Sequence, residues 1–272
     1  MATIRTPAVA GLFYPANPQC LLENIGCLLS SAQVSRCLPK VLIVPHAGYI
    51  YSGVVAASAY VTLKLIAECV RRVVLLGPAH RTFLHGLALP REAIFATPLG
   101  QVKVDATAAE KIARLPQVSI NSSVHALEHS LEVQLPFLQY LLEDFSILPV
   151  VVGRASVDEV SDVLDCVWGG EETLIIISSD LSHYLPYAAA QREDNKTAAS
   201  ILELHQEIDH THACGATPIN ALMAVARKHC LIPHLLDLRN SGDTAGSTDR
   251  VVGYGAFAFM SQDVPKRTGY AS

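Results

Sequence analysis

Four short runs of apolar, mostly β-branched residues constrain the fold of this chain more than any other feature. They lie at residues 41–44, 73–76, 147–152 and 174–177, and each run stops abruptly at turn or polar residues. A continuous apolar run without alternation is typical of a strand that is covered on both faces, as in the central sheet of an α/β protein. The runs therefore predict four buried strands.

Helical patterns lie between these runs. We expect helices at residues 53–67, 105–115, 158–167, 187–204 and 218–228. A hairpin at a sheet edge is predicted within residues 87–105, and a last buried strand at residues 251–260. No linker, repeat or charge block divides the chain. The expected fold is α/β, with a central mixed β-sheet flanked by helices in a single domain of residues 1–272.

The composition narrows the classes of partner. Half of the 272 residues are apolar, so the chain can bury a substantial core. A net charge of −5 gives no broad attraction to nucleic acid or to an anionic membrane. No stretch reaches the roughly 18 apolar residues of a membrane helix, and residues 1–9 hold no apolar signal region. The seven cysteines form no C-x-x-C pair, which favours reduced thiols and a cytoplasmic location.

Potential metal ligands follow three of the four apolar runs. His46 and His80 each follow one run within a few residues, and the pair Asp180 and His183 follows another. Ligands of α/β sheets bind beyond the carboxyl ends of the strands, so parallel strands would bring these side chains to one edge. The alternative for each histidine alone is a strand-terminal residue that bonds a loop carbonyl.

Two further groups add candidate ligands. His125 and His129 are four residues apart and would share one face of a helix, although the order of residues is not that of an H-E-x-x-H motif. We expect His125 to be structural, whereas His129 fits either interpretation. Cys214 precedes Gly215 and a predicted helix, whose dipole would favour a thiolate that serves as ligand or nucleophile. The alternative is a small buried apolar residue.

The other six cysteines are expected to be structural, because free cysteines are usually buried. They are Cys20, Cys27, Cys37, Cys69, Cys166 and Cys230. The sequence also lacks the G-x-G-x-x-G, G-x-x-x-x-G-K-[ST] and G-x-S-x-G motifs, which disfavours dinucleotide binding, P-loop phosphate binding and an α/β-hydrolase site.

An ordered set of motifs runs through nearly the whole chain. It includes P-H-A-G-Y, G-P-A-H, E-H-S-L-E-V-Q-L-P-F, S-S-D-L-S-H-Y and C-G, and it begins with R-T-P-A-V-A-G-L-F-Y-P at residues 5–15. With these motifs the sequence resembles the Memo family, also described as protein B of the AmmeMemoRadiSam system. The resemblance implies a fold similar to that of the class III extradiol dioxygenases, non-haem iron enzymes whose metal is held by two histidines and a carboxylate.

The resemblance also implies a set of site residues. The Memo family has a cysteine in place of the carboxylate, so the implied metal ligands are His46, His80 and Cys214. Asp180 and His183 would line the same cleft at the strand ends, with His183 as acid or base and Asp180 orienting it or the substrate. A thiolate ligand favours iron or copper, with zinc as a further option.

Several functions are compatible with such a site. The first is a redox-active, dioxygenase-like oxidoreductase that acts on an unknown small molecule. The second is a module that binds a peptide or protein in the same cleft without catalysis. The system name implies a functional link to a radical SAM protein and its small partner protein. A hydrolase with Cys214 as nucleophile and His183 as base lacks a recognisable oxyanion hole and ranks last.

Overall fold

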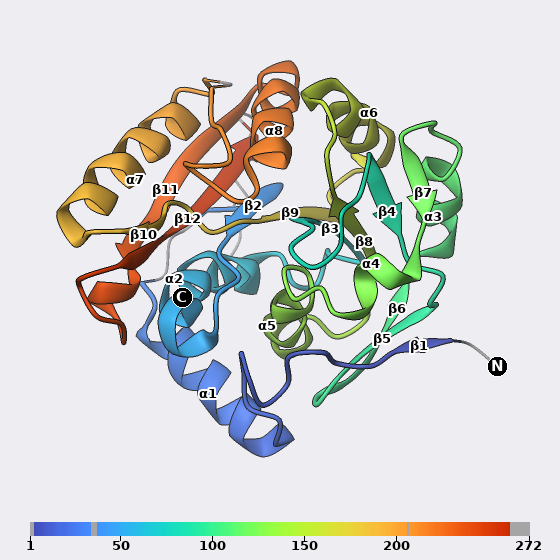
Figure 1. The fold of residues 1–272 in the computed structure, drawn as a ribbon. Coiled ribbons are helices and arrows are strands. Elements are labelled where there is room, and N and C mark those ends of the chain that lie inside the picture. The colour runs from blue at the N-terminus through green and yellow to red at the C-terminus, as the bar shows by residue number, and fades with distance from the viewer. Residues whose placement is uncertain (1–2, 34–36, 206, 262–272) are drawn as a thin grey trace, which may run out of the picture.

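The computed structural model describes residues 3–33, 37–205 and 207–261, and its strands join into one sheet (Figure 1). The strands are β1 (Ile4–Arg5), β2 (Val41–Val44), β3 (Arg72–Pro78), β4 (Leu87–Leu89), β5 (Ile94–Thr97), β6 (Gly100–Val104), β7 (Val118–Ile120), β8 (Ser146–Val152), β9 (Thr173–Ser178), β10 (His183–Leu185), β11 (Leu231–Asn240) and β12 (Val251–Ser261). The α-helices are α1 (Pro18–Ser31), α2 (Tyr49–Tyr60), α3 (Ala106–Ile112), α4 (Ser122–Ala126), α5 (Leu135–Leu141), α6 (Val157–Val167), α7 (Tyr187–Leu202) and α8 (Ala216–Lys228). Short 3₁₀ helices are η1 (Val61–Leu65), η2 (Glu132–Gln134) and η3 (Ser241–Asp243).

The sheet has 12 strands and is mixed, which confirms the predicted α/β class. Its main order is β1-β5-β6-β8-β3-β9-β2-β12-β10, with β11 added to β12 and β4 joining β7 to β8. The four predicted central strands are β8, β3, β9 and β2, and they are parallel neighbours in that order. The carboxyl ends of these four strands therefore lie along one edge of the sheet.

Helices cover both faces of the central strands, which explains the unbroken apolar runs. Figure 1 shows α1, α2 and α5 on one side of the sheet and α6 and α8 on the other. In β2, Leu42 and Val44 face the first group of helices, while Val41 and Ile43 face the second. All four side chains are fully buried, and each stabilises the fold by about 1.5 to 3 kcal/mol relative to exposure.

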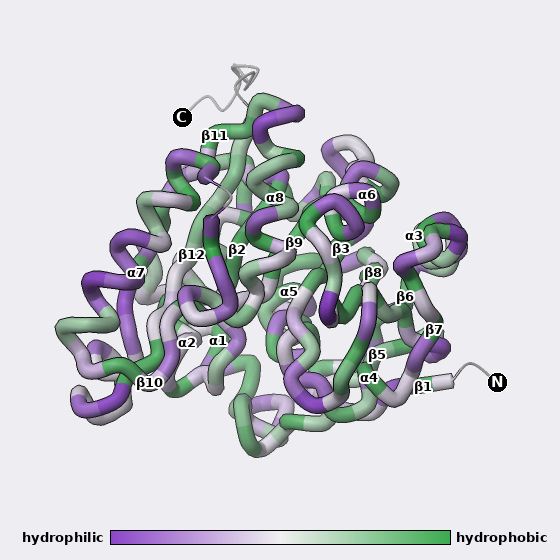
Figure 2. Tube along the Cα trace, turned by 45° about the horizontal axis from the view of Figure 1, so that its top comes forward, coloured by the Kyte–Doolittle hydropathy of each residue, from purple (hydrophilic) through white to green (hydrophobic). Residues whose placement is uncertain are grey.

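Hydrophobic residues are concentrated in the central strands, and polar residues lie on the outer helices. In Figure 2 the central strands are mainly green, and purple segments lie on the outer turns of helices such as α7 and α3. None of the helices within the described ranges is long and apolar enough to cross a membrane.

Local sequence signals explain several helix boundaries. Asp105 caps α3 by accepting a hydrogen bond from the Ala108 N–H, and Ser156 and Glu159 form a capping box at the start of α6. The predicted helix at residues 53–67 is partly wrong, because α2 begins at Tyr49, directly after Gly48, and changes to the 3₁₀ helix η1 after Tyr60.

The region of residues 87–105 holds the predicted hairpin, formed by β5 and β6. Its first part is a separate strand, β4, which pairs with β8 and β7. The long strand β11 was not predicted, and it pairs with β12 from Leu231 opposite Ser261 to Asn240 opposite Gly253.

Candidate metal centre

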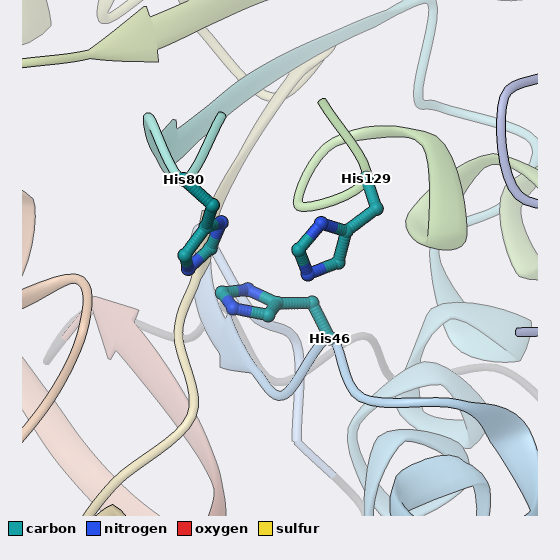
Figure 3. Close-up of side chains that lie close together, drawn as sticks. All are labelled: His46, His80 and His129. Atoms are coloured by element: carbon teal, nitrogen blue, oxygen red, sulfur yellow. The ribbon is translucent and has the colours of Figure 1, made fainter. Parts of the chain in front are cut away.

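Three histidines meet at the edge of the sheet where β2, β3 and β9 end. His46 follows β2 by two residues and His80 follows β3 by two residues, so the parallel strands bring them together. His129 comes from the segment between α4 and η2. One ligand nitrogen from each histidine lies within 4.8 Å of the other two. Figure 3 shows the three rings pointing toward one another.

The rings pack closely enough to share one ion. The ring centroids of His46 and His80 are 5.0 Å apart, and those of His80 and His129 are 4.7 Å apart in a stacked arrangement. Phe13, from the N-terminal segment, packs against His129, with the two ring centroids 4.7 Å apart. His46 is the most buried of the three histidines.

Glu128 is the carboxylate that organises two of these histidines. Its Oε1 atom lies 2.9 Å from His80 Nδ1, and its Oε2 atom accepts a hydrogen bond from the His80 backbone N–H at 2.6 Å. It also accepts hydrogen bonds from the backbone N–H groups of His129 and Ser130, each at 2.9 Å. Burial by itself would raise the pKa of Glu128, but the hydrogen bonds from His80 and Ser130 lower it to about 2. Glu128 is therefore ionised at neutral pH.

An ionised Glu128 can only accept hydrogen bonds, so His80 carries its proton on Nδ1. The Nε2 atom of His80 is then free to bind a metal. A carboxylate that bonds the far nitrogen of a metal-ligating histidine is a common arrangement, since it fixes the tautomer and the ring orientation.

His46 is held through its backbone and its ring. Its backbone N–H donates to Asp180 Oδ1 at 2.8 Å, and its Nδ1 atom lies 2.9 Å from Ser178 Oγ. Burial, followed by the neighbouring His80 and His129, lowers the pKa of His46 well below its usual value. The ring is therefore neutral, as a metal ligand must be.

Cys214 lies next to this ring. Its Sγ atom is 3.3 Å from His46 Nε2 and accepts a hydrogen bond from the Asp180 backbone N–H, also at 3.3 Å. Gly215 allows the close approach, because a Cβ atom at this position would lie 2.7 Å from Ser179 Cβ. The C-G motif thus brings the thiol against the end of β9.

The expectation that the helix dipole makes Cys214 a thiolate is wrong for the metal-free site. Burial first, and then the carboxylate of Asp180, raise the pKa of the thiol to about 12. The thiol is therefore protonated at neutral pH even though it lies close to the start of α8. A metal would have to displace this proton before the sulfur could bind it.

Asp180 and His183 lie beyond the end of β9. Asp180 is buried, and burial raises its pKa although the His46 N–H, His183 and His80 act in the opposite direction. His183 begins β10 opposite Val252 and interacts electrostatically with both His46 and Asp180. The next residue, Tyr184, has a left-handed backbone with φ of 58°, which is rare for a non-glycine residue.

The region around His125 differs from the prediction. His125 and His129 do not share a helix face, because α4 ends at Ala126 and the Glu128 carboxylate binds the next backbone N–H groups in a loop. His125 is structural, as expected: its Nε2 atom lies 2.9 Å from the Ala88 carbonyl oxygen. Sequence reasoning gave Glu128 no role, although it begins the E-H-S-L-E-V-Q-L-P-F motif and directly precedes His129.

The six other cysteines form no disulfide within the described residues, but they are not uniformly buried as predicted. Cys37 is buried and Cys69 and Cys166 are half-buried, whereas Cys20, Cys27 and Cys230 are exposed. Cys214 is the cysteine that approaches the histidine group.

The donor atoms of this site fit a transition metal. His129 Nδ1 is buried and has no hydrogen-bond partner in the described part of the chain, and Glu128 Oε1, 3.4 Å away, is not in hydrogen-bonding geometry with it. Figure 3 shows the other ring nitrogen of His129, Nε2, on the side of His46, so this nitrogen could hold an ion together with the other two rings. Neutral imidazoles and a thiol are donors that suit iron, copper and zinc.

Comparisons with known proteins show which family this chain resembles along most of its length. The sequence profile of the family described as Memo-like protein matches residues 5–258. A MEMO1 family protein of Aquifex aeolicus is 36% identical over 273 residues, which cover 94% of this chain and 99% of that protein. A MEMO1 family protein of Sulfolobus acidocaldarius is 35% identical, with 92% and 97% covered. Another from Metallosphaera sedula is 34% identical, with 94% and 99% covered.

Proposed function

This chain belongs to the Memo-like family, and we propose that it binds one redox-active transition metal through His46, His80 and Cys214. The observation that carries the proposal is the convergence of three histidine nitrogens within 4.8 Å, with the Cys214 sulfur 3.3 Å from one of these rings. Iron and copper suit this mixture of imidazole and sulfur donors, and zinc is the alternative.

The third ligand distinguishes this proposal from a site of three histidines. Burial lowers the pKa of His129 to about 4, so this residue offers a neutral imidazole, whereas Cys214 must lose its proton before it can bind. A thiolate is the stronger and softer donor, and its negative charge offsets the charge of a divalent ion. We therefore propose Cys214 as the ligand and His129 as a neighbour that faces the remaining position.

The proposed activity is a dioxygenase-like oxidoreductase with an unknown small-molecule substrate. A bound iron or copper would supply electron transfer and oxygen activation. The proposed role of His183 is to move a proton to or from the substrate. The proposed role of Asp180 is to hold the His46 backbone through its 2.8 Å hydrogen bond and to orient His183 electrostatically.

Metal analysis of protein purified without oxygen tests the proposal. We expect about one transition metal per chain in the wild type and a loss of most of it in His46→Ala, His80→Ala and Cys214→Ala. His234→Ala is the control, because this histidine is exposed on β11. Full metal content in all three ligand variants would overturn the proposed site. Oxygen consumption by the iron-loaded wild type, absent in His183→Ala, would separate an oxidoreductase from a protein that only binds metal.

A second candidate function is the binding of a peptide or partner protein. Large apolar side chains are exposed within five residues of the site histidines, and a partner that packs against several of them would gain apolar contact area. They are Ile50, Tyr51, Phe83, Leu127 and Tyr184. Peptides selected from a display library would distinguish the functions: affinity that survives the loss of His46, His80 and Cys214 but not Phe83→Ser favours this second candidate.

The cellular setting is part of the same proposal. None of the seven cysteines forms a disulfide within the described residues, which supports a reducing, cytoplasmic location. The family resemblance supports a functional link to a radical SAM protein and its small partner. Co-purification of this chain with those two proteins from the native cell tests that link, and their absence from the purified material would contradict it.

A further inference from the structure

We infer that a buried hydrogen-bond chain of Tyr60, Gln134 and Ser178 sets the tautomer of His46, so that His46 offers Nε2 and not Nδ1 to its ligand. Ser178 is the last residue of β9, Gln134 ends η2 and Tyr60 ends α2. The inference rests on the proposed function only where it concerns metal binding. The tautomer itself belongs to the metal-free protein.

The first step is the single proton of the Ser178 hydroxyl. Ser178 Oγ lies 2.6 Å from the carbonyl oxygen of Ser130, which can only accept a hydrogen bond. The hydroxyl proton must therefore point to Ser130. If it pointed elsewhere, two oxygen lone pairs would face each other at this short distance in a buried site.

The second step is the orientation of the Gln134 amide. Its Nε2 atom donates to the Pro45 carbonyl oxygen at 3.1 Å and to Ser178 Oγ at 2.8 Å. Its Oε1 atom accepts a hydrogen bond from the Tyr60 hydroxyl at 2.7 Å. A flipped amide would place its oxygen against the Pro45 carbonyl, so the carbonyl fixes the amide. Every hydrogen-bonding atom of the Gln134 side chain is then used.

The third step follows for His46. Ser178 Oγ already donates to Ser130 and accepts from Gln134, so its remaining capacity is one lone pair. His46 Nδ1, at 2.9 Å from Ser178 Oγ, must therefore carry the proton and donate it. A neutral imidazole carries one proton, so Nε2 then has the free lone pair, and this atom lies 3.3 Å from the Cys214 sulfur.

His80 has the same tautomer, because its Nδ1–H donates a hydrogen bond to Glu128. Two different devices, a carboxylate and a serine hydroxyl, thus leave both histidines with Nε2 free. Tyr60, Gln134 and Ser178 are all buried, and the hydrogen-bond chain from Tyr60 and Gln134 reaches the His46 ring through Ser178. They are positioning residues, and the Q-L-P-F part of the E-H-S-L-E-V-Q-L-P-F motif gains a role through Gln134.

Nitrogen-15 NMR of the histidine side chains in metal-free protein tests the inference. The His46 signals are those that disappear from the spectrum of His46→Ala. We expect wild-type His46 to be at least 90% in the Nδ1-protonated form at neutral pH. Ser178→Ala should remove this preference and give a mixture of tautomers. Ser52→Ala is the matched control, because Ser52 is a buried serine whose hydroxyl donates to the Ala47 carbonyl and not to His46.

Separate variants test Gln134 and Tyr60, the two members of the hydrogen-bond chain that lie beyond Ser178. Gln134→Met and Tyr60→Phe should shift the His46 tautomer in the same direction as Ser178→Ala but by less. If neither shifts it, the positioning role is confined to Ser178 and the inferred chain is wrong. An Nε2-protonated His46 in the wild type, or an unchanged tautomer in Ser178→Ala, would overturn the inference altogether.

Metal titration of the same variants separates this inference from the proposed function. Loss of a group that orients a ligand usually lowers metal affinity 10- to 100-fold, so we expect a drop of about that size for Co²⁺ in Ser178→Ala and none in Ser52→Ala. A wild type that shows the Nδ1-protonated form but binds no metal would refute the proposed function and leave the tautomer assignment intact. An unchanged Co²⁺ affinity in Ser178→Ala, with a changed tautomer, would show that the tautomer does not govern metal binding.

Discussion

Glu128 and Glu132 are two buried carboxylates four residues apart, and they serve different parts of the molecule. Glu132 binds the N-terminal segment: it pairs with Arg5 at 2.7 Å and accepts hydrogen bonds from Tyr14 and from the backbone N–H groups of Ala8 and Val9. Glu128 instead binds His80 and the loop of His129. One carboxylate has a permanent cation beside it, whereas the other faces histidines that must stay neutral to bind metal.

This difference separates stability from function. Arg5 compensates the charge of Glu132, and its guanidinium also donates to the carbonyl oxygens of His125 and Glu128. The pair therefore anchors the loop beneath the site. Within the described residues Glu128 pairs with no arginine or lysine. Its charge is stabilised by N–H groups, and it would act on a bound metal through the ring of His80. Substitutions at the partners of Glu132 should act on folding alone, whereas those at Glu128 should act on metal affinity as well as on stability.

The largest effect is expected for Arg5→Met. The substitution leaves Glu132 buried without its cation, which typically costs about 3 to 5 kcal/mol of unfolding free energy. Urea denaturation measures the loss. Lys196→Met is the control, because the exposed pair of Lys196 and Glu193 should contribute less than about 1 kcal/mol. Equal losses in the two variants would remove the distinction between buried anchor and surface pair.

A second prediction concerns stability in acid. The folded-state pKa of Glu128 is lowered from 4.5 to about 2, so its contribution is fully present above about pH 4.5 and is lost as the pH falls toward 2. The stability lost over this range should be up to about 3 kcal/mol larger in the wild type than in Glu128→Gln. Denaturation curves at several pH values measure it, and parallel curves for the two proteins would contradict it.

The third prediction concerns metal affinity in Glu128→Gln. The glutamine amide has only one oxygen and can turn its NH₂ group toward His80, so His80 Nδ1 no longer has a fixed acceptor. Affinity for Co²⁺ should therefore fall about 10- to 100-fold. Isothermal titration calorimetry at neutral pH measures the change. Glu193→Gln, on the surface of α7, should leave the affinity unchanged. A Glu128→Gln protein with wild-type affinity would show that this carboxylate only supports the fold.

The smallest effect is expected for Tyr14→Phe. It removes the 2.6 Å hydrogen bond to Glu132 while Arg5 and two backbone N–H groups remain. The loss should be about 1.5 kcal/mol in unfolding free energy, without any change in metal affinity. A large loss of affinity would mean that the N-terminal segment governs the site as well as the fold.

The sequence predicted the parts of the fold that depend on local patterns. The apolar runs identified β2, β3, β8 and β9, since strands buried on both faces need continuous apolar residues. Position at the strand ends also singled out His46 and His80. The strand β11 was missed, because its residues alternate poorly between buried and exposed and include Pro233.

The rest of the site depends on contacts between distant residues. Glu128 meets His80 across 48 positions, and Ser178 meets His46 across 132, so no local pattern reveals these hydrogen bonds. The protonated state of Cys214 was predicted wrongly for the same reason: its burial and its neighbour Asp180 arise only from the fold.

Optical titration of the metal-free protein with Co²⁺ under anaerobic conditions tests the proposed ligand set most directly. A cobalt–thiolate bond gives an intense near-ultraviolet charge-transfer band that imidazole ligands alone do not give. We predict one Co²⁺ per chain with this band in the wild type, binding without the band in Cys214→Ala, and loss of tight binding in His46→Ala and His80→Ala. Wild-type binding without the thiolate band, together with loss of binding in His129→Ala, would show a site of three histidines and contradict Cys214 as a ligand.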